Sequence, residues 1–235
     1  MNILAFDTST AQGSVAVWSE NQLLSEKIWR RAHSHSELLT AEIENGLLES
    51  QLKMSDVDAL AVGQGPGSFT GIRVAINAAR ALAYALKKKV YVFETSETLV
   101  QPVLRLELPV LTIINAQKNS FFVSRFKNVT KDGAVQWQRT RETSFTTLPE
   151  LELLLNEPHL CIGDGCLEAE LALGPEAKLN WIRDASVSDF PLASSLARLA
   201  ILPSKNAQPS DWNAVQPLYL RASGAEEKLR EGSKS

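Results

Sequence analysis

Residues 72–86 form a stretch that would be apolar on nearly every side as a helix. Its only polar positions are Arg73, Asn77 and Arg80, which lie along one narrow line at i, i+4 and i+7. A helix that is apolar almost all round must be covered on more than one side. Because one sheet covers only one face, the pattern predicts either a helix sandwiched within this protein or one that meets another chain.

A glycine-rich loop with Gly65, Gly67 and Gly71 leads into this helix. Glycines let the backbone adopt conformations that other residues avoid, and the unpaired amides of a helix start can hold an anion. Ser68 or Thr70 is expected to cap the helix or to donate to a ligand. The loop is not a Walker loop, because no Gly-Lys-Ser/Thr follows at the required spacing. A tight strand-to-helix turn and an anion site both remain open.

The first half of the chain predicts a mixed sheet with helices on its faces. Leu39, Ile43 and Leu47 recur at four-residue spacing, which indicates an amphipathic helix. Gly46 lies on its apolar side, where the lack of a side chain would let another helix approach closely. The expected elements are strands at 3–7, 14–18 and 23–29, a helix at 36–49, a strand at 59–63, the alanine-rich helix and a strand at 90–93.

The second half repeats the opening pattern, which predicts a duplicated unit. Strands are expected at 111–115, 121–124, 135–137 and 160–162, with helices at 148–155, 166–173 and 191–202. Pro102 and Pro109 mark the best domain boundary. We therefore expect one lobe at 1–105, a second at 106–222, and a polar, disordered tail at 223–235.

Composition narrows the classes of function. The chain has 24 basic and 27 acidic side chains and a formal net charge of −3, which argues against a protein that grips nucleic acid alone. No apolar run approaches the roughly 18–20 residues needed to span a bilayer, and the N-terminus lacks the features of a signal peptide. Cys161 and Cys166 are too few for a disulfide framework and lack zinc-site spacing, so we expect a cytoplasmic protein.

Four short segments are informative together. The most specific is Gly-Pro-Gly-Ser-Phe-Thr-Gly-Ile-Arg at 65–73. Ile-Leu-Ala-Phe-Asp-Thr-Ser at 3–9, His-Ser-Glu-Leu-Leu at 35–39 and Pro-Leu-Tyr-Leu-Arg at 217–221 support it. With these segments, nearly the whole chain resembles the bacterial TsaB (YeaZ-like) family of tRNA threonylcarbamoyladenosine biosynthesis proteins. The resemblance implies an α/β fold of two actin-like (ribonuclease H-like) lobes with duplicated βββαβα units.

The resemblance also implies a function. Family members are scaffolds without an active site that dock a homologous catalytic subunit, TsaD, and assemble with a small ATPase, TsaE. The complex transfers a threonylcarbamoyl group to the adenosine beside the anticodon of tRNAs that read codons starting with A. The chain itself would then hold no catalytic residue, cofactor or metal. The partner would supply the metal, and ATP or ADP at or near the shared interface is left open.

The same resemblance assigns contacts to particular residues. tRNA would be bound only through the complex, no membrane is involved, and the chain alone would form a homodimer. The implied docking surface comprises the first two helices, with Leu39, Ile43, Gly46, Leu47, Arg73, Ile76, Ala79, Arg80 and Ala83. The glycine loop at the second helix start comprises Gly65, Gly67, Ser68, Thr70 and Gly71, and the vestigial phosphate loop comprises Asp7, Thr8 and Ser9.

Two enzyme classes remain as alternatives. A nucleotide-dependent phosphotransferase of the same superfamily would cradle phosphate on the first hairpin, yet no glycine follows Asp7 until Gly13. Asp7 is instead expected to cap the turn. A glycoprotease-type peptidase would need Ser68 to meet His35 or His159, and the chain has no Gly-x-Ser-x-Gly elbow.

Three further features complete the interpretation. His33 and His35 are too few for a metal site and are expected to be solvated at a helix start. Asn-Ala-Gln at 115–117 replaces the Asp-Ala-Arg usual in the family, which puts any charge pairing by that motif in doubt. Gly-Asp-Gly at 163–165 resembles the family pattern and is either a turn or a ligand contact.

Overall fold

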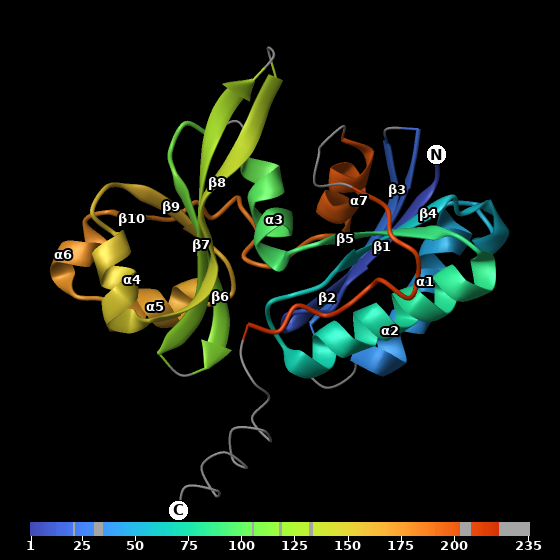
Figure 1. The fold of residues 1–235 in the computed structure, drawn as a ribbon, viewed down its shortest axis with the longest axis horizontal. Coiled ribbons are helices and arrows are strands. Elements are labelled where there is room, and N and C mark those ends of the chain that lie inside the picture. Colours follow the sequence, from blue (N-terminus) through green and yellow to red (C-terminus); the bar gives the residue numbers. More distant parts are fainter. Residues whose placement is uncertain are drawn as a thin grey trace, which may run out of the picture.

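The computed structural model describes residues 1–20, 22–30, 35–104, 106–117, 119–131, 134–202 and 208–220. Two lobes lie side by side, each built on its own five-stranded sheet (Figure 1). Residues 221–235, which include Arg221 and the expected tail, lie outside the described residues, as do His33 and the turn at 132–133.

The first sheet has the strand order β3-β2-β1-β4-β5. Strands β1, β2 and β3 form the expected antiparallel meander, and β4 and β5 run parallel to β1. The bounds are β1 Ile3–Asp7, β2 Gln12–Ser19, β3 Gln22–Arg30, β4 Ala59–Gly63 and β5 Lys89–Phe93. Every residue of β1 and β4 is buried, as expected of central strands with helices on both faces.

Helices cover both faces of this sheet. Helices α1 (His35–Glu49) and α2 (Phe69–Leu86) lie on one face, and α7 (Ala193–Ile201) lies on the other (Figure 1). Side chains alternate along β1: Leu4 and Phe6 belong to the core under α1 and α2, while Ile3 and Ala5 belong to the core under α7. Helix α2 therefore packs its inner side on the sheet, and α1 packs beside it.

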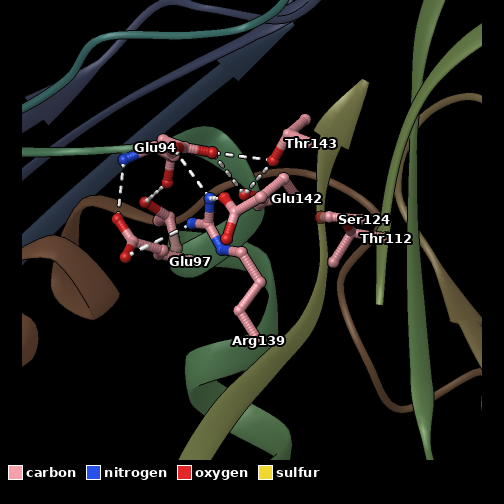
Figure 2. A network of polar contacts seen from close by, with 9 residues as sticks. Glu94, Glu97, Thr112, Ser124, Arg139, Glu142 and Thr143 are labelled. Atoms are coloured by element: carbon pink, nitrogen blue, oxygen red, sulfur yellow. Dashed lines mark hydrogen bonds and ion pairs between the residues drawn. The ribbon is translucent and has the colours of Figure 1, made fainter. Parts of the chain in front are cut away.

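The second sheet repeats the topology of the first, which confirms the predicted duplication. Its order, β8-β7-β6-β9-β10, matches β3-β2-β1-β4-β5 strand for strand. The hydroxyls of Thr112 and Ser124 hydrogen-bond between β6 and β7 at 2.6 Å (Figure 2). The bounds are β6 Val110–Gln117, β7 Ser120–Lys131, β8 Ala134–Thr147, β9 His159–Ile162 and β10 Trp181–Ile182.

Short helices flank the second sheet. Helices α4 (Leu148–Leu154), α5 (Cys166–Ala172) and α6 (Pro175–Lys178) pack on one face. Helix α3 (Thr95–Val100) and the 3-10 turn Gln101–Val103 pack on the other. A second 3-10 turn, Met54–Asp56, precedes β4 in the first lobe. The sequence interpretation missed α3 and β10, since both are too short for a hydrophobic period to develop.

The end of the chain returns to the first lobe. Helix α7 packs against β1, β2 and β4, although the sequence interpretation placed residues 191–202 in the second lobe. Residues 208–220, here called the C-terminal strap, then run beside α2. Ser210 bridges to Val90 of β5, Val215 is buried in the core under α2, and the Leu218 amide donates to the Gln64 carbonyl at 2.8 Å. Both sheets lie on the expected sides of residue 105, but the second half of the chain contributes to both lobes.

An ion-pair network joins the segment after β5 to β8 (Figure 2). Arg139 on β8 donates to Glu94 at 2.8 Å and to Glu142 at 3.1 Å, and lies 3.4 Å from Glu97. Thr143 donates to the other carboxylate oxygen of Glu94 at 2.7 Å. Burial alone would lower the pKa of Arg139, but the hydrogen bond and charge of Glu94 outweigh it and raise that pKa. The network fixes the start of α3, where the chain passes between lobes, against the second sheet.

Within the described residues, the helices are all too short or too polar to cross a lipid bilayer.

Candidate functional site

The glycine loop is a helix-capping turn. The Ser68 hydroxyl accepts a hydrogen bond from the Gly71 amide at 3.3 Å, which confirms the predicted cap at the start of α2. Thr70 lies exposed in the first helical turn. Of the two residues proposed as caps, Ser68 takes this position.

The glycines of this loop allow it to lie directly against the first hairpin. A Cβ atom on Gly71 would lie 1.8 Å from the Thr8 carbonyl oxygen, and one on Gly67, at φ +155°, would lie 2.1 Å from that of Ser9. The Ser68 amide donates to the Ser9 carbonyl at 2.6 Å, and the Thr8 hydroxyl donates to the Gly71 carbonyl at 2.7 Å. The loop therefore needs glycine for backbone-to-backbone packing within this chain.

The vestigial phosphate loop is filled by its own side chains. Asp7, Thr8 and Ser9 are fully buried. One Asp7 carboxylate oxygen, Oδ1, accepts from the Ser9 amide and the Ser9 hydroxyl, each at 2.7 Å, so Asp7 caps the turn as predicted. Its other oxygen, Oδ2, has no hydrogen-bond partner among the described residues and occupies the space over Gly63, where a Cβ atom would lie 1.7 Å away.

Burial also sets the protonation of this turn. It raises the pKa of Asp7 from 3.8 to about 6, although the hydrogen bonds from Ser9 oppose that shift. Asp7 and Ser9 are bonded to each other and Thr8 is bonded to the Gly71 carbonyl, so this buried turn offers no exposed side chain to a phosphate. This geometry gives no support to the phosphotransferase alternative.

Most residues expected at the docking surface face the protein's own core. In α1, Leu39, Ile43 and Leu47 are buried against the first sheet. Gly46 also faces that sheet, because a Cβ atom there would lie 3.5 Å from Val17, in ordinary van der Waals contact. The expectation that Gly46 allows another helix to approach is wrong, because its neighbour is strand β2.

The same correction applies to α2. Ile76, Ala79 and Ala83 are buried in the core beneath the helix and cannot contact a partner directly. In α1 the four-residue spacing identified the inward side of the helix, whereas the inward side of α2 lies within a stretch that is apolar almost all round. Of the nine residues expected at the docking surface, only Arg73 and Arg80 reach the outside of α2.

The outward side of α2 is nevertheless largely apolar, and that of α1 carries a few apolar residues among polar and acidic ones. The residues concerned, here called the docking face, are exposed or half-buried and comprise Leu38, Ala41, Leu48, Val74, Ala78, Ala81 and Tyr84. Leu48 is 77% exposed and Tyr84 is 67% exposed. Val74 and Ala78 are partly buried against the core, and the Trp212 ring of the C-terminal strap contacts Tyr84 edge-on. Because Leu48 and Tyr84 still remain largely exposed, the described part of the chain does not fully enclose this face. Exposed apolar surface on neighbouring helices is typical of a protein–protein interface.

The line of polar residues predicted on α2 borders a groove. A cavity of about 330 Å³ lies between α2 and the C-terminal strap, with Arg73, Asn77 and Arg80 on one wall and Gln216 and Tyr219 on the other. The sequence interpretation did not associate the strap with α2. The Pro-Leu-Tyr-Leu motif at 217–220 was the one sequence feature that drew attention to the C-terminal strap.

The two histidines that the structure describes form no catalytic pair with Ser68. His35 begins α1 but is buried rather than solvated, because its ring bonds to the Trp29 indole at 3.2 Å and to the Thr10 carbonyl at 3.0 Å. His159 is buried in the other lobe and bonds to the Glu157 carbonyl at 2.6 Å. Burial lowers the pKa of both imidazoles. This arrangement gives no support to the peptidase alternative.

The cysteines are buried and free. Burial raises the pKa of Cys161 to about 12 and that of Cys166 well above its ordinary value. Their thiols are therefore protonated and poorly reactive at neutral pH. Within the described part of the chain, no three His, Cys, Asp or Glu side chains are grouped so that they could hold a metal ion.

The Gly-Asp-Gly segment forms a turn that joins β9 to α5. Asp164 accepts from the Asn115 amide at 2.9 Å, and Gly163, at φ +126°, donates to Asp189 at 3.1 Å. The Asn115 side-chain amide also donates to the Glu168 carboxylate at 3.0 Å. The Asn-Ala-Gln segment, which replaces the usual family motif, thus still binds a carboxylate through a neutral amide. Burial raises the pKa of Asp164 to about 6, against the opposing effect of the Asn115 hydrogen bond.

Comparison with known proteins supports this interpretation of the fold. The family model described as "TsaD: tRNA N6-adenosine threonylcarbamoyltransferase" matches residues 22–152, more than half of the chain. The TsaB protein of Escherichia coli (strain K12), a tRNA threonylcarbamoyladenosine biosynthesis protein, is 28% identical over 97% of this chain and 98% of its own length. The corresponding Bacillus subtilis (strain 168) protein is 26% identical over the full length of both.

A solved structure agrees with these relatives. The crystal structure of a Pseudomonas aeruginosa protein with similarity to peptidase YEAZ superposes with a TM-score of 0.75 at 24% identity, covering 94% of this chain and 99% of that one. Two sheets of matching order, with a first hairpin filled by its own side chains, define a two-lobed protein of actin-like fold. The chain belongs to the TsaD family and, within it, is a TsaB/YeaZ-like protein.

Proposed function

We propose that this chain is a non-catalytic subunit in the biosynthesis of threonylcarbamoyladenosine in tRNA. It acts in the cytoplasm by docking a TsaD-like catalytic subunit through the docking face of α1 and α2. The uncovered apolar surface of these two helices carries the proposal, since Leu48 and Tyr84 are exposed by 77% and 67%. The partner supplies the metal and the chemistry, and a TsaE-like ATPase and tRNA join the assembled pair.

Several features of the structure support a scaffold rather than an enzyme. Asp7 is bonded within its own turn, Ser68 caps a helix, and neither described histidine bonds to Ser68. The small residues Ala41, Ala78 and Ala81 on the docking face would let a partner helix approach closely, and Tyr84 would supply a large apolar contact. Without the partner, two copies of the chain cover this face by pairing with each other.

Two leucines of nearly equal exposure, one on the docking face and one on the second lobe, allow a matched test of the proposed docking. Leu48→Glu places a charge on the docking face, and Leu171→Glu does the same on α5 of the second lobe, where the leucine is 78% exposed. We expect Leu48→Glu to abolish co-purification with the catalytic subunit and reconstituted tRNA modification, because a buried unpaired charge destabilises the interface. Leu171→Glu should leave both unchanged. Equal partner binding by both variants would refute the proposed docking.

A further inference from the structure

The groove beside α2 carries two cationic side chains that are free of carboxylates. Among the described residues, neither Arg73 nor Arg80 forms an ion pair, whereas Arg139 and Arg183 each bond to carboxylates. The groove is also lined by two side-chain amides, Asn77 from α2 and Gln216 from the strap, and the Gln216 amide nitrogen donates to the Asn213 carbonyl at 3.4 Å. Guanidinium and amide N–H groups together match the hydrogen-bonding needs of carboxylates.

Aromatic rings hold both guanidinium groups in place. The Arg73 guanidinium lies 3.9 Å from the centre of the Phe69 ring, and its Nε donates to the Tyr219 hydroxyl at 2.9 Å. Phe69 and Tyr219 in turn stack at 4.8 Å. A side chain that is already ordered loses less conformational entropy when it binds a ligand. Arg73 is therefore preorganised for binding although it lies at the surface.

Arg80 is held in a similar way one step further along the helix. Its guanidinium lies 5.9 Å from the centre of the Trp212 ring, and Trp212 contacts Tyr84 edge-on at 5.2 Å. Tyr84 belongs to the docking face, so the groove continues directly from that face. The strap that supplies Trp212 is fixed to β5 by the Ser210 bridge. A partner that covers the docking face would thus also reach the groove.

The spacing of the two arginines determines how far apart two carboxylates of a bound helix must lie. Arg73 and Arg80 are seven residues apart, which is about two helical turns or roughly 10 Å along the axis of α2. A helix laid alongside α2 presents side chains at the same interval when they are also seven residues apart. Two carboxylates at i and i+7 of such a helix would each face one guanidinium.

The surroundings favour a protein segment over a polyanion such as RNA. The neighbouring docking face is apolar and suits helix packing rather than a solvated phosphate chain. We propose that the groove formed by Arg73, Arg80 and the C-terminal strap binds an acidic helix of the docked subunit, with two carboxylates spaced two turns apart. This assignment rests on the proposed function, because the helix belongs to the subunit docked there.

The test compares neutral substitutions in and outside the groove. Arg73→Gln, Arg80→Gln and the double variant remove the charges, and Arg198→Gln does the same at an exposed site on α7. Binding to the purified catalytic subunit is measured by calorimetry at about 50 mM and 300 mM salt, since ion pairs weaken as salt rises. We expect each single variant to bind roughly tenfold more weakly at low salt and the double variant to lose most of the salt dependence. Arg198→Gln should match the wild type.

The possible outcomes separate this inference from the proposed function. If the wild-type chain does not bind the catalytic subunit, the proposed function fails and the groove assignment fails with it. If the wild type binds and the double variant binds equally, with the same salt dependence, only the groove assignment is overturned. It is also overturned if the double variant binds the subunit normally but the assembled complex loses affinity for tRNA, which would make the groove a phosphate site.

Discussion

At the scale of single residues, burial controls the charge of Asp7. This carboxyl is fully buried at the end of β1, and its pKa is raised from 3.8 to about 6. Between these pH values the folded protein binds a proton that the unfolded chain releases. The stabilisation by this proton is complete below about pH 4 and is lost as the pH rises through about 6.

The prediction concerns Asp7→Asn, which keeps the oxygen that accepts from Ser9 but cannot ionise. As the pH rises from 4 to 6, the free energy of unfolding of the wild type should fall. This fall should exceed that of the variant by up to about 3 kcal/mol. Asp164 contributes its own slope to both proteins. Denaturant melts across this pH range measure the difference, with Glu176→Gln on α6 as the control. Parallel curves for Asp7→Asn and wild type would show that Asp7 is ionised normally.

At the scale of elements, the contact between α3 and β8 depends on one half-buried arginine. Arg139 and Glu94 are only 15% and 18% exposed, and Glu94 also caps the start of α3. Removing one partner of such a pair leaves the other charge buried without compensation. The contact therefore determines how the chain that connects the lobes is held.

We expect Arg139→Ala to lower the free energy of unfolding by roughly 2–3 kcal/mol, below the range for fully buried pairs because this pair is partly solvated. Glu94→Gln in the same chain should restore part of the loss, because it removes the unpaired charge. Arg198→Ala provides a control at an exposed arginine. A loss for Arg139→Ala no larger than that of the control would mean that the network contributes nothing to stability.

The sequence predicted the helices and strands better than it predicted which elements pack against each of them. Short apolar runs bounded by turn residues located the strands of both meanders, a four-residue apolar spacing located α1, and a long alanine-rich stretch located α2. The six-residue helix α3 and the two-residue strand β10 are too short to show a period. The side of α1 and α2 that looked most apolar proved to be the inner one, with Ile76 and Ala79 in the core.

In the candidate site, too, local contacts could be predicted from the sequence and long-range contacts could not. The cap by Ser68 and the turn at Asp7 depend on contacts within a few residues or on a common motif, and both were predictable. The groove depends on Arg73 meeting Tyr219, which is 146 residues away along the chain. A contact between residues so far apart leaves no local sequence pattern, so the position of the C-terminal strap beside α2 could not be predicted from the sequence.

At the scale of the whole molecule, the helices of both lobes expose apolar side chains, and in the first lobe this surface adjoins the groove beside α2. The docking face and the adjoining groove belong to the side of the first lobe that α1 and α2 cover. The return of α7 and the C-terminal strap to this lobe covers its other face and builds one wall of the groove. The central claim is therefore that a partner covers the outward sides of α1 and α2.

Side-chain footprinting with hydroxyl radicals tests that claim most directly, because it reports the solvent exposure of individual residues in the unmodified protein. Leu48 and Tyr84 should react readily in the chain diluted to its monomeric state. On addition of the catalytic subunit their labelling should fall several-fold, while Leu153 and Leu171 on the second lobe should stay unchanged. Unaltered labelling of Leu48 and Tyr84 in a saturated complex would contradict the account.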